Sequence, residues 1–209
     1  MGRQKLLLPI DGEPMIARVI DATSAWTTVL VASTDLATVL RDAPVRIVRN
    51  DAPERGMTHS LRLANETISD DEAIAIVLGD LPDLTQAAIA RAIAAYDETI
   101  DVVVPRNAKR FAHPIVFGPR ARARIAALPD GDTLRGLRDD PTLRRREIEV
   151  ALHDAPADID TPADYAARAN TLAEFPSRET PRARPGHGKA VCQVDLLGDM
   201  GKQRHADPD

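Results

Sequence analysis

An aspartate that follows a short aliphatic run is the residue best placed for metal and phosphate chemistry in this sequence. Residues 73–78 read Ala-Ile-Ala-Ile-Val-Leu, and Asp80 comes two residues later. Open α/β sheets bind their ligands at the carboxyl ends of strands, and Mg²⁺ holds a nucleotide through one or two carboxylates together with phosphate oxygens. The alternative is a helix cap, but Asp83 and Thr85 are better placed for that role. We therefore predict that Asp80 binds Mg²⁺.

Two further aspartates precede the predicted start of another helix. Asp158 and Asp160 alternate along an extended stretch, so only one of them can face a given site. Residues 161–164, Thr-Pro-Ala-Asp, have the composition of a capping box with proline at the first helical position, and this role does not require the two aspartates before them. We predict that Asp160 joins Asp80 at one Mg²⁺, with Asp158 as the alternative.

Two basic residues near the start of the sequence are candidates for phosphate binding. Arg3 and Lys5 alternate ahead of the run Leu6–Pro9. In an extended stretch both side chains can reach the same triphosphate, arginine as a fork and lysine as a point charge. Solvated charges are the alternative, and these two residues alone do not decide between the interpretations.

The elements that must position these residues alternate between two kinds. Short, continuous aliphatic runs are typical of strands buried on both faces, and amphipathic stretches with helical spacing lie between them. We expect strands at residues 28–33, 45–48, 73–78, 101–104 and 115–117, and helices at 14–25, 57–68 and 84–96. Strand and helix in alternation indicate βαβ units. The sequence therefore predicts an α/β fold with a doubly wound, mostly parallel sheet.

The composition limits the class of protein. The chain has 209 residues, a formal net charge of −5 and one cysteine. A net-acidic chain is atypical of a dedicated nucleic-acid binder, and one cysteine excludes an internal disulfide framework. No apolar run approaches the ~20 residues that cross a bilayer. We expect a cytoplasmic protein that has neither a nucleic-acid nor a membrane partner.

Basic residues are concentrated in one part of the chain. Residues 106–146 contain eleven lysines and arginines but only four acidic residues. This segregation suggests a face that meets an anionic partner, with a solvated helical surface as the alternative.

The periodic patterns end before residue 174. Residues 174–209 are rich in proline, glycine and charge, a composition typical of disordered segments. A short apolar patch, Val191–Leu197, contains the single cysteine, Cys192, and is either a docking motif or part of an inert tail. We expect one domain over residues 1–173 and a disordered, charged tail over 174–209.

Six segments, taken together and in order, resemble the motifs of one enzyme family. They are Met1–Pro9, Glu54–Arg62, Gly79–Pro82, His113–Phe117, Gly131–Thr133 with Arg135, and Asp158–Pro162. The sequence resembles the MobA-like NTP transferases, and most closely their molybdenum cofactor (molybdopterin) cytidylyltransferase branch. The resemblance leaves the expected tail unmatched, and it implies a Rossmann-like, GT-A-like nucleotidyltransferase fold.

The resemblance implies roles for residues on the nucleotide side. Lys5 matches the phosphate-binding lysine of the family, and Arg3 occupies a variable position beside it. Gly56, Met57 and Ser60 match the segment that lies near the nucleotide base and ribose.

The resemblance also implies a metal site and an acceptor site. Asp80 matches the Mg²⁺-binding aspartate of a Gly-Asp-x-Pro motif, and Asp160 resembles the second metal-site residue. His113 matches the His-Pro motif of the acceptor site, which also includes Arg135. The basic residues of 106–146 then fit the side that receives the phosphate of an anionic pterin.

The implied reaction transfers a nucleoside monophosphate from an NTP, CTP or GTP, to the phosphate of molybdopterin or Mo-molybdopterin. Pyrophosphate leaves, stabilised by Lys5, and no protein nucleophile is needed. The run Leu6–Pro9 favours CTP. The alternatives are a related enzyme acting on a sugar phosphate or similar acceptor, and a non-catalytic protein that delivers the cofactor. A molybdoenzyme or its maturation factor is an expected partner.

The sequence departs from the family pattern at two places. Ala112 stands where the family has glycine before His-Pro, and the chain starts inside the first motif, without the preceding strand and glycine-rich loop. That strand is central in a doubly wound sheet, so its loss would leave two neighbouring strands without ladder partners. Either the start codon was assigned too late, or the product is truncated and its catalysis impaired. We favour the first explanation.

Overall fold

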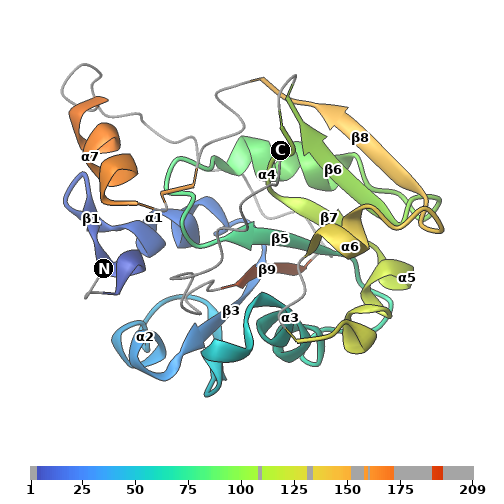
Figure 1. Ribbon diagram of the computed structural model, residues 1–209, viewed down its shortest axis with the longest axis horizontal. Coiled ribbons are helices and arrows are strands. Elements are labelled where there is room, and N and C mark those ends of the chain that lie inside the picture. Colours follow the sequence, from blue (N-terminus) through green and yellow to red (C-terminus); the bar gives the residue numbers. More distant parts are fainter. Residues whose placement is uncertain are drawn as a thin grey trace, which may run out of the picture.

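The computed structural model of the chain is a twisted sheet with helices packed against its faces (Figure 1). It describes residues 4–107, 110–130, 134–151, 158–159, 161–171 and 190–194. None of the described helices combines the length and the apolar character that crossing a bilayer requires.

The described strands form one large sheet and one small hairpin. In chain order they are β1 (Pro9–Ile10), β2 (Glu13–Pro14), β3 (Thr27–Ser33), β4 (Arg46–Asn50), β5 (Ile74–Leu78), β6 (Val102–Arg106), β7 (Ile115–Phe117), β8 (Arg145–Glu149) and β9 (Ala190–Val194). The large sheet has the order β4-β3-β9-β5-β7-β6-β8. Its neighbours are parallel except at β7, which runs antiparallel to β5 and β6. The predicted α/β fold with a doubly wound, mostly parallel sheet is confirmed.

The helices connect these strands. They are the 3-10 turns η1 (Lys5–Leu7), η2 (Pro53–Arg55) and η3 (Ile125–Ala127), and the α-helices α1 (Met15–Ala22), α2 (Thr34–Val39), α3 (Met57–Asn65), α4 (Gln86–Ala94), α5 (Pro119–Arg122), α6 (Leu134–Arg138) and α7 (Pro162–Thr171). The three helices predicted from their amphipathic spacing are α1, α3 and α4. Each ends two or three residues earlier than predicted, and α1 and α4 also begin later.

The centre of the sheet is formed by the last described segment of the chain. β9 pairs in parallel with β3 and with β5, and Val194 lies opposite Val31 and Leu78. The expectation that residues 174–209 are disordered is therefore wrong for Ala190–Val194, while the rest of that segment lies outside the described residues. The expected loss of ladder partners is also wrong, because β9 bonds to both neighbours. The backbone N–H and C=O groups of β3 and β5 that face each other need hydrogen-bond partners. The short, mostly apolar segment Ala190–Val194 supplies them from between the two strands.

Alternating side chains of the strands give the sheet two apolar faces. Ala75, Val77 and Val103 pack with α1 and α4 on one face. Ile74 and Ile76 pack with α3, η3 and α6 on the other face. Both faces are covered, which is why the central strands are continuous aliphatic runs rather than alternating ones.

Besides β9, the edge strand β8 and the β1–β2 hairpin were absent from the sequence-based prediction. β8 is an edge strand whose side chains alternate between exposed and half-buried, so its sequence Arg-Arg-Glu-Ile-Glu has no aliphatic run. The β1–β2 hairpin turns at Asp11 and Gly12, which have φ angles of 54° and 86°. An Asp-Gly pair readily adopts this left-handed conformation.

Candidate functional site

The carboxyl edge of the sheet holds a buried aspartate paired with a lysine. Asp80 lies two residues beyond β5 and is only 5% exposed. Lys5 Nζ donates to Asp80 Oδ2 at 2.9 Å. The residue before Asp80 is Gly79, where an added Cβ would meet Leu6 Cδ1 at 3.0 Å. The glycine therefore allows η1, which carries Lys5, to pack closely against the end of β5.

The second oxygen of this carboxylate is buried and has no hydrogen-bond partner among the residues that the structure describes. Asp80 Oδ1 shares this property with Gln4 Oε1, on the residue before Lys5. Leaving a buried polar atom unpaired costs about 1–3 kcal/mol, so such atoms mark strain or an absent ligand. Oxygen donors of this kind are those that Mg²⁺ and Mn²⁺ prefer. The donor chemistry of Asp80 fits a divalent cation, and Gln4 was missed because one glutamine carries no motif.

The segment that precedes α7 lies beside Asp80. Ile159 N donates to the main-chain oxygen of Asp80 at 3.2 Å, and the Ile159 side chain is 4% exposed. Asp158 is exposed. Asp160 lies outside the described residues, so its role as a metal ligand stays a prediction.

The capping box predicted at the start of α7 is confirmed. The main-chain N–H and the hydroxyl of Thr161 both donate to Asp164 Oδ2 at 2.7 Å, and Asp164 N donates back to the hydroxyl at 3.1 Å. Arg168 on the same helix donates to both oxygens of Asp83, at 2.6 and 2.5 Å. Asp83 thus anchors α7, and Thr85 caps α4 by accepting from Ala88 N. Neither role needs Asp80.

The residues matched to the base and ribose segment lie further along the same edge. Gly56 is the N-cap of α3, and Met57 is its first residue. Ser60 Oγ accepts from Asn50 Nδ2 at 2.9 Å, which ties α3 to the end of β4. Because β4 is three strands from β5, this group lies roughly 14 Å from the Asp80 end of the sheet. The structure places these residues on the same edge as Asp80 but not in contact with it.

The predicted acceptor histidine lies on the other side of Asp80. His113 precedes β7 through a cis peptide bond to Pro114, and its Nδ1 lies 3.3 Å from Ile76 O. Burial lowers the pKa of His113, and Arg138 lowers it further, while the Ile76 hydrogen bond and the charge of Asp80 oppose the change. Since a carbonyl can only accept, the neutral ring carries its proton on Nδ1 and presents Nε2 as an acceptor.

An arginine that the sequence-based analysis did not select completes this side. The Arg138 guanidinium lies over the Phe111 ring, 4.0 Å from its centroid, and Arg106 lies 5.4 Å from the same centroid. Arg135 is exposed on α6, one turn before Arg138. The excess of arginines over residues 106–146 predicted a cationic face, but only the folded structure distinguishes Arg138 within it, because Arg138 lies over Phe111 and also lowers the pKa of His113. Arg3 and the segment Gly131–Thr133 lie outside the described residues.

The comparisons with known proteins decide the family. Residues 1–147 match the MobA-like NTP transferase domain. The chain belongs to the MobA-like NTP transferase family. This match covers most of the chain and includes Lys5, Asp80 and His113. It makes the protein a nucleotidyltransferase-family member, in agreement with the predicted resemblance.

Solved structures share the fold of this MobA-like domain. They include Rv0371c from Mycobacterium tuberculosis in complex with manganese (21% identity, 80% of this chain and 92% of that one, TM-score 0.67). A nucleotidyl transferase from Methanothermobacter is 22% identical, and the match covers 81% of this chain and 85% of that one with a TM-score of 0.67. Molybdopterin-guanine dinucleotide biosynthesis protein A from Archaeoglobus fulgidus is 14% identical, and the match covers 83% of this chain and 93% of that one with a TM-score of 0.62. The comparison with curated proteins gives no match.

Proposed function

We propose that this MobA-like domain transfers a nucleoside monophosphate, CMP by preference, from an NTP to the phosphate of molybdopterin or Mo-molybdopterin. The observation that carries the proposal is the Asp80 carboxylate, which is buried at the carboxyl edge of the sheet with one oxygen held by Lys5 and the other unpaired. Such an arrangement suits a site for a cation and a polyphosphate.

Asp80 would hold Mg²⁺ together with phosphate oxygens, and Asp160 would join it. A protein with the same fold is known in complex with manganese, which supports the use of a divalent cation. When bound, the ion offsets the negative charge of the phosphates during the displacement. Asp80 is fixed for this role from two sides, since Ile159 bonds its main-chain oxygen and Lys5 its side chain.

Lys5 would bind the triphosphate through its Nζ, the atom that now donates to Asp80. As a point charge it can stabilise both the bound triphosphate and the departing pyrophosphate, and Arg3 would assist it. Gly56 and Met57, at the N-terminus of α3, would lie near the nucleoside, with Ser60 holding α3 to the end of β4 through Asn50.

The acceptor phosphate would bind on the side of His113, Arg135 and Arg138. Phosphate monoesters have a second pKa near 6, so the attacking oxygen is already ionised at neutral pH and needs no general base. That oxygen forms a bond to the α-phosphorus as the bond from α-phosphorus to the bridging oxygen breaks, and pyrophosphate takes the electron pair. The neutral His113 ring would accept a hydrogen bond at Nε2 from the acceptor.

The test is a matrix of donors and acceptors. Each of the four NTPs is incubated with the protein, MgCl₂ or MnCl₂, and either molybdopterin or a sugar phosphate, and pyrophosphate release is measured. We expect release with molybdopterin, fastest with CTP. Release only with GTP would overturn the base preference, and release only with the sugar phosphate would identify a related transferase. No release from any pair, with molybdopterin still bound, would favour a cofactor-delivery protein.

We further propose a cytoplasmic protein that serves a molybdoenzyme or its maturation factor, without a nucleic-acid or membrane partner.

A further inference from the structure

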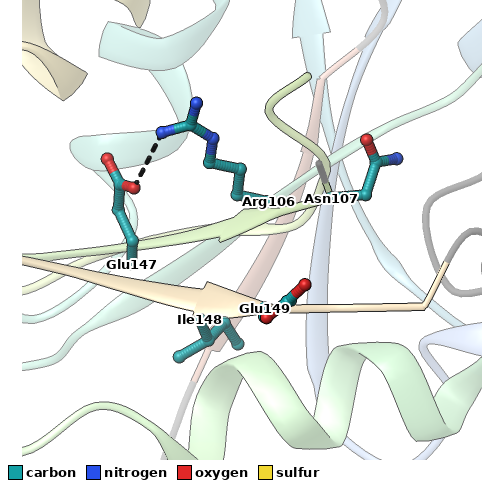
Figure 2. A pocket seen from close by; sticks show the side chains of 5 residues that line it. All are labelled: Arg106, Asn107, Glu147, Ile148 and Glu149. Carbon is teal, nitrogen blue, oxygen red and sulfur yellow. Dashed lines mark hydrogen bonds and ion pairs between the residues drawn. The ribbon is translucent and has the colours of Figure 1, made fainter. Parts of the chain in front are cut away.

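A cavity lies at the carboxyl ends of β6 and β8, apart from the residues that sequence motifs identify. It has a volume of about 360 Å³ and is lined by Arg106, Asn107, Glu147, Ile148 and Glu149 (Figure 2). Ligand pockets begin at roughly this size, so the cavity can accept a small ring system.

The ladder registers align this cavity with the candidate catalytic centre. Leu78 at the end of β5, Arg106 at the end of β6 and Glu149 at the end of β8 lie in one row across the carboxyl edge. The strand between β5 and β6 is β7, which His113 precedes. Neighbouring strands are ~4.8 Å apart, which puts Arg106 roughly 10 Å and Glu149 roughly 14 Å from Leu78. A ligand whose phosphate lies beside Asp80 could therefore extend past His113 into the cavity.

One wall of the cavity is held in place by charge pairs and an aromatic ring. Arg106 donates to Glu147 Oε2 at 3.2 Å, and Arg145 pairs with Glu147 Oε1 at 3.0 Å. Arg106 also lies over the Phe111 ring. The charge of Glu147 is therefore matched within the protein, and both of its oxygens are used.

Glu149 differs from Glu147 although both side chains lie on the same face of β8. Its side chain is exposed and makes no hydrogen bond or ion pair within the described ranges, and its backbone lies directly opposite Arg106 in the ladder. A carboxylate offers four acceptor positions and no donor. The cavity thus presents one unmatched acceptor group in a part of the chain that is otherwise rich in arginine.

We propose that Glu149 binds the donor edge of the acceptor's ring, and so determines which acceptor is used. The inference rests on the proposed function, because it takes the acceptor to be a phosphorylated pterin. The 2-amino-4-oxo ring of a pterin carries two adjacent N–H donors, the cyclic counterpart of a guanidinium fork, and a carboxylate accepts both at once. A phosphorylated sugar offers no such planar pair.

The test compares two ring systems that differ at a single group. The probes are 6-hydroxymethylpterin phosphate and the matching lumazine phosphate, in which a 2-oxo group replaces the 2-amino group. Binding to the full chain is followed by the intrinsic fluorescence of the probes. We expect the pterin to bind at least about tenfold more tightly than the lumazine, since the lumazine loses one charge-assisted hydrogen bond. Equal affinities, or no binding of the pterin, would overturn the proposal.

Variants locate the effect. Glu149→Gln should weaken pterin binding at least about tenfold and leave lumazine binding within twofold, because the amide replaces one acceptor with a donor. Glu66→Gln, the same change at an exposed glutamate at the end of α3, should change neither affinity. If Glu149→Gln binds the pterin as the parent chain does, Glu149 has no part in recognition.

Kinetics separate this inference from the proposed function. In the transfer assay, Glu149→Gln should raise the KM for the acceptor and leave the KM for the NTP and kcat unchanged. Turnover with an unchanged acceptor KM would sink the inference and leave the function intact. Selective pterin binding that is lost in Glu149→Gln, without turnover from any NTP, would sink the transferase function and leave the site intact.

Discussion

Two buried aspartates at opposite edges of the sheet have contrasting surroundings. Asp101, just before β6, is 2% exposed and accepts from the main-chain nitrogen of Arg144 at 2.8 Å and from its guanidinium at 2.8 and 3.0 Å, with Arg120 at 3.3 Å. Asp80, just after β5, is 5% exposed but has one unpaired oxygen. The amino edge satisfies its carboxylate completely, and the carboxyl edge does not.

The pKa of Asp101 reflects this difference. The Arg144 hydrogen bonds lower the pKa of Asp101 to about 2, against the opposing effect of burial. Such a carboxylate stabilises the fold, and both of its oxygens are engaged by arginine. Asp80 has fewer stabilising hydrogen bonds, since only Oδ2 accepts from Lys5, and its Oδ1 can still bind a ligand. Both carboxylates are buried and charged, so what separates the structural one from the candidate functional one is whether both of its oxygens have hydrogen-bond partners.

The largest expected effect comes from a substitution that interrupts the sheet, because both Asp80 and Asp101 are positioned by its strands. Cys192→Pro in β9 places a residue without an N–H between β3 and β5. Proline is excluded from central strands because it removes a ladder hydrogen bond, so we expect loss of cooperative unfolding in urea. Cys192→Val, which keeps the ladder, is the control. A Cys192→Pro chain that unfolds at the same urea concentration as the parent would contradict a central β9.

The carboxyl edge is tested by Asp80→Asn. If Asp80 holds the catalytic cation, turnover should fall at least ~10²-fold. The unfolding free energy should change by no more than about 1 kcal/mol, because asparagine still offers Lys5 an acceptor oxygen. The exposed Asp70→Asn is the matched control. A kcat equal to that of the parent chain would refute the metal-binding role.

The amino edge should respond in the opposite way. Asp101→Asn is expected to lower the unfolding free energy by about 2 kcal/mol, because the uncharged amide has a single acceptor oxygen and cannot accept both hydrogen bonds of the Arg144 fork. Turnover per folded molecule should stay within twofold of the parent. Equilibrium urea unfolding at pH 7 and the transfer assay measure the two quantities. A variant that unfolds like the parent would show that the arginine contacts add nothing to stability.

The same carboxylate predicts how stability depends on pH. Its pKa is depressed from 3.8 to about 2 on folding, so its contribution is fully present above pH 4 and is lost as the pH falls towards 2. The depression corresponds to about 2 kcal/mol. Urea unfolding at several pH values should show this decline in the parent chain and a smaller one in Asp101→Asn. Parallel curves for the two chains would assign the acid sensitivity to other carboxylates.

The smallest expected effect is on stability, from loss of the Thr85 cap at the start of α4, in which Asp80 takes no part. Thr85 accepts from Ala88 N at the start of α4, and Thr85→Ala should cost about 1 kcal/mol. We expect no change in turnover, since Asp80 takes no part in the cap. A larger loss of activity than of stability would mean that the cap also positions Asp80.

Particular residues show how far the sequence could be interpreted. The aliphatic runs at β3, β5 and β7 predicted strands because both faces of the sheet are covered, and the Thr-Pro-Ala-Asp pattern predicted the start of α7 because a capping box is local. β8 was missed because an edge strand needs no aliphatic run. Arg138 was missed because its selection from the arginines of residues 106–146 depends on the Phe111 ring.

The class of fold and the position of Asp80 at the end of a strand can be predicted from the sequence alone, since both follow from local residue patterns, whereas the ion pair of Asp80 with Lys5 joins segments 75 residues apart and is seen only in the folded chain. The tertiary structure alone decided that Ala190–Val194 forms the central strand, that Asp80 Oδ1 is left unpaired and that Glu149 faces a cavity. The physical reason is that hydrogen-bond satisfaction and strand order depend on contacts between segments far apart in the chain, which residue spacing does not encode.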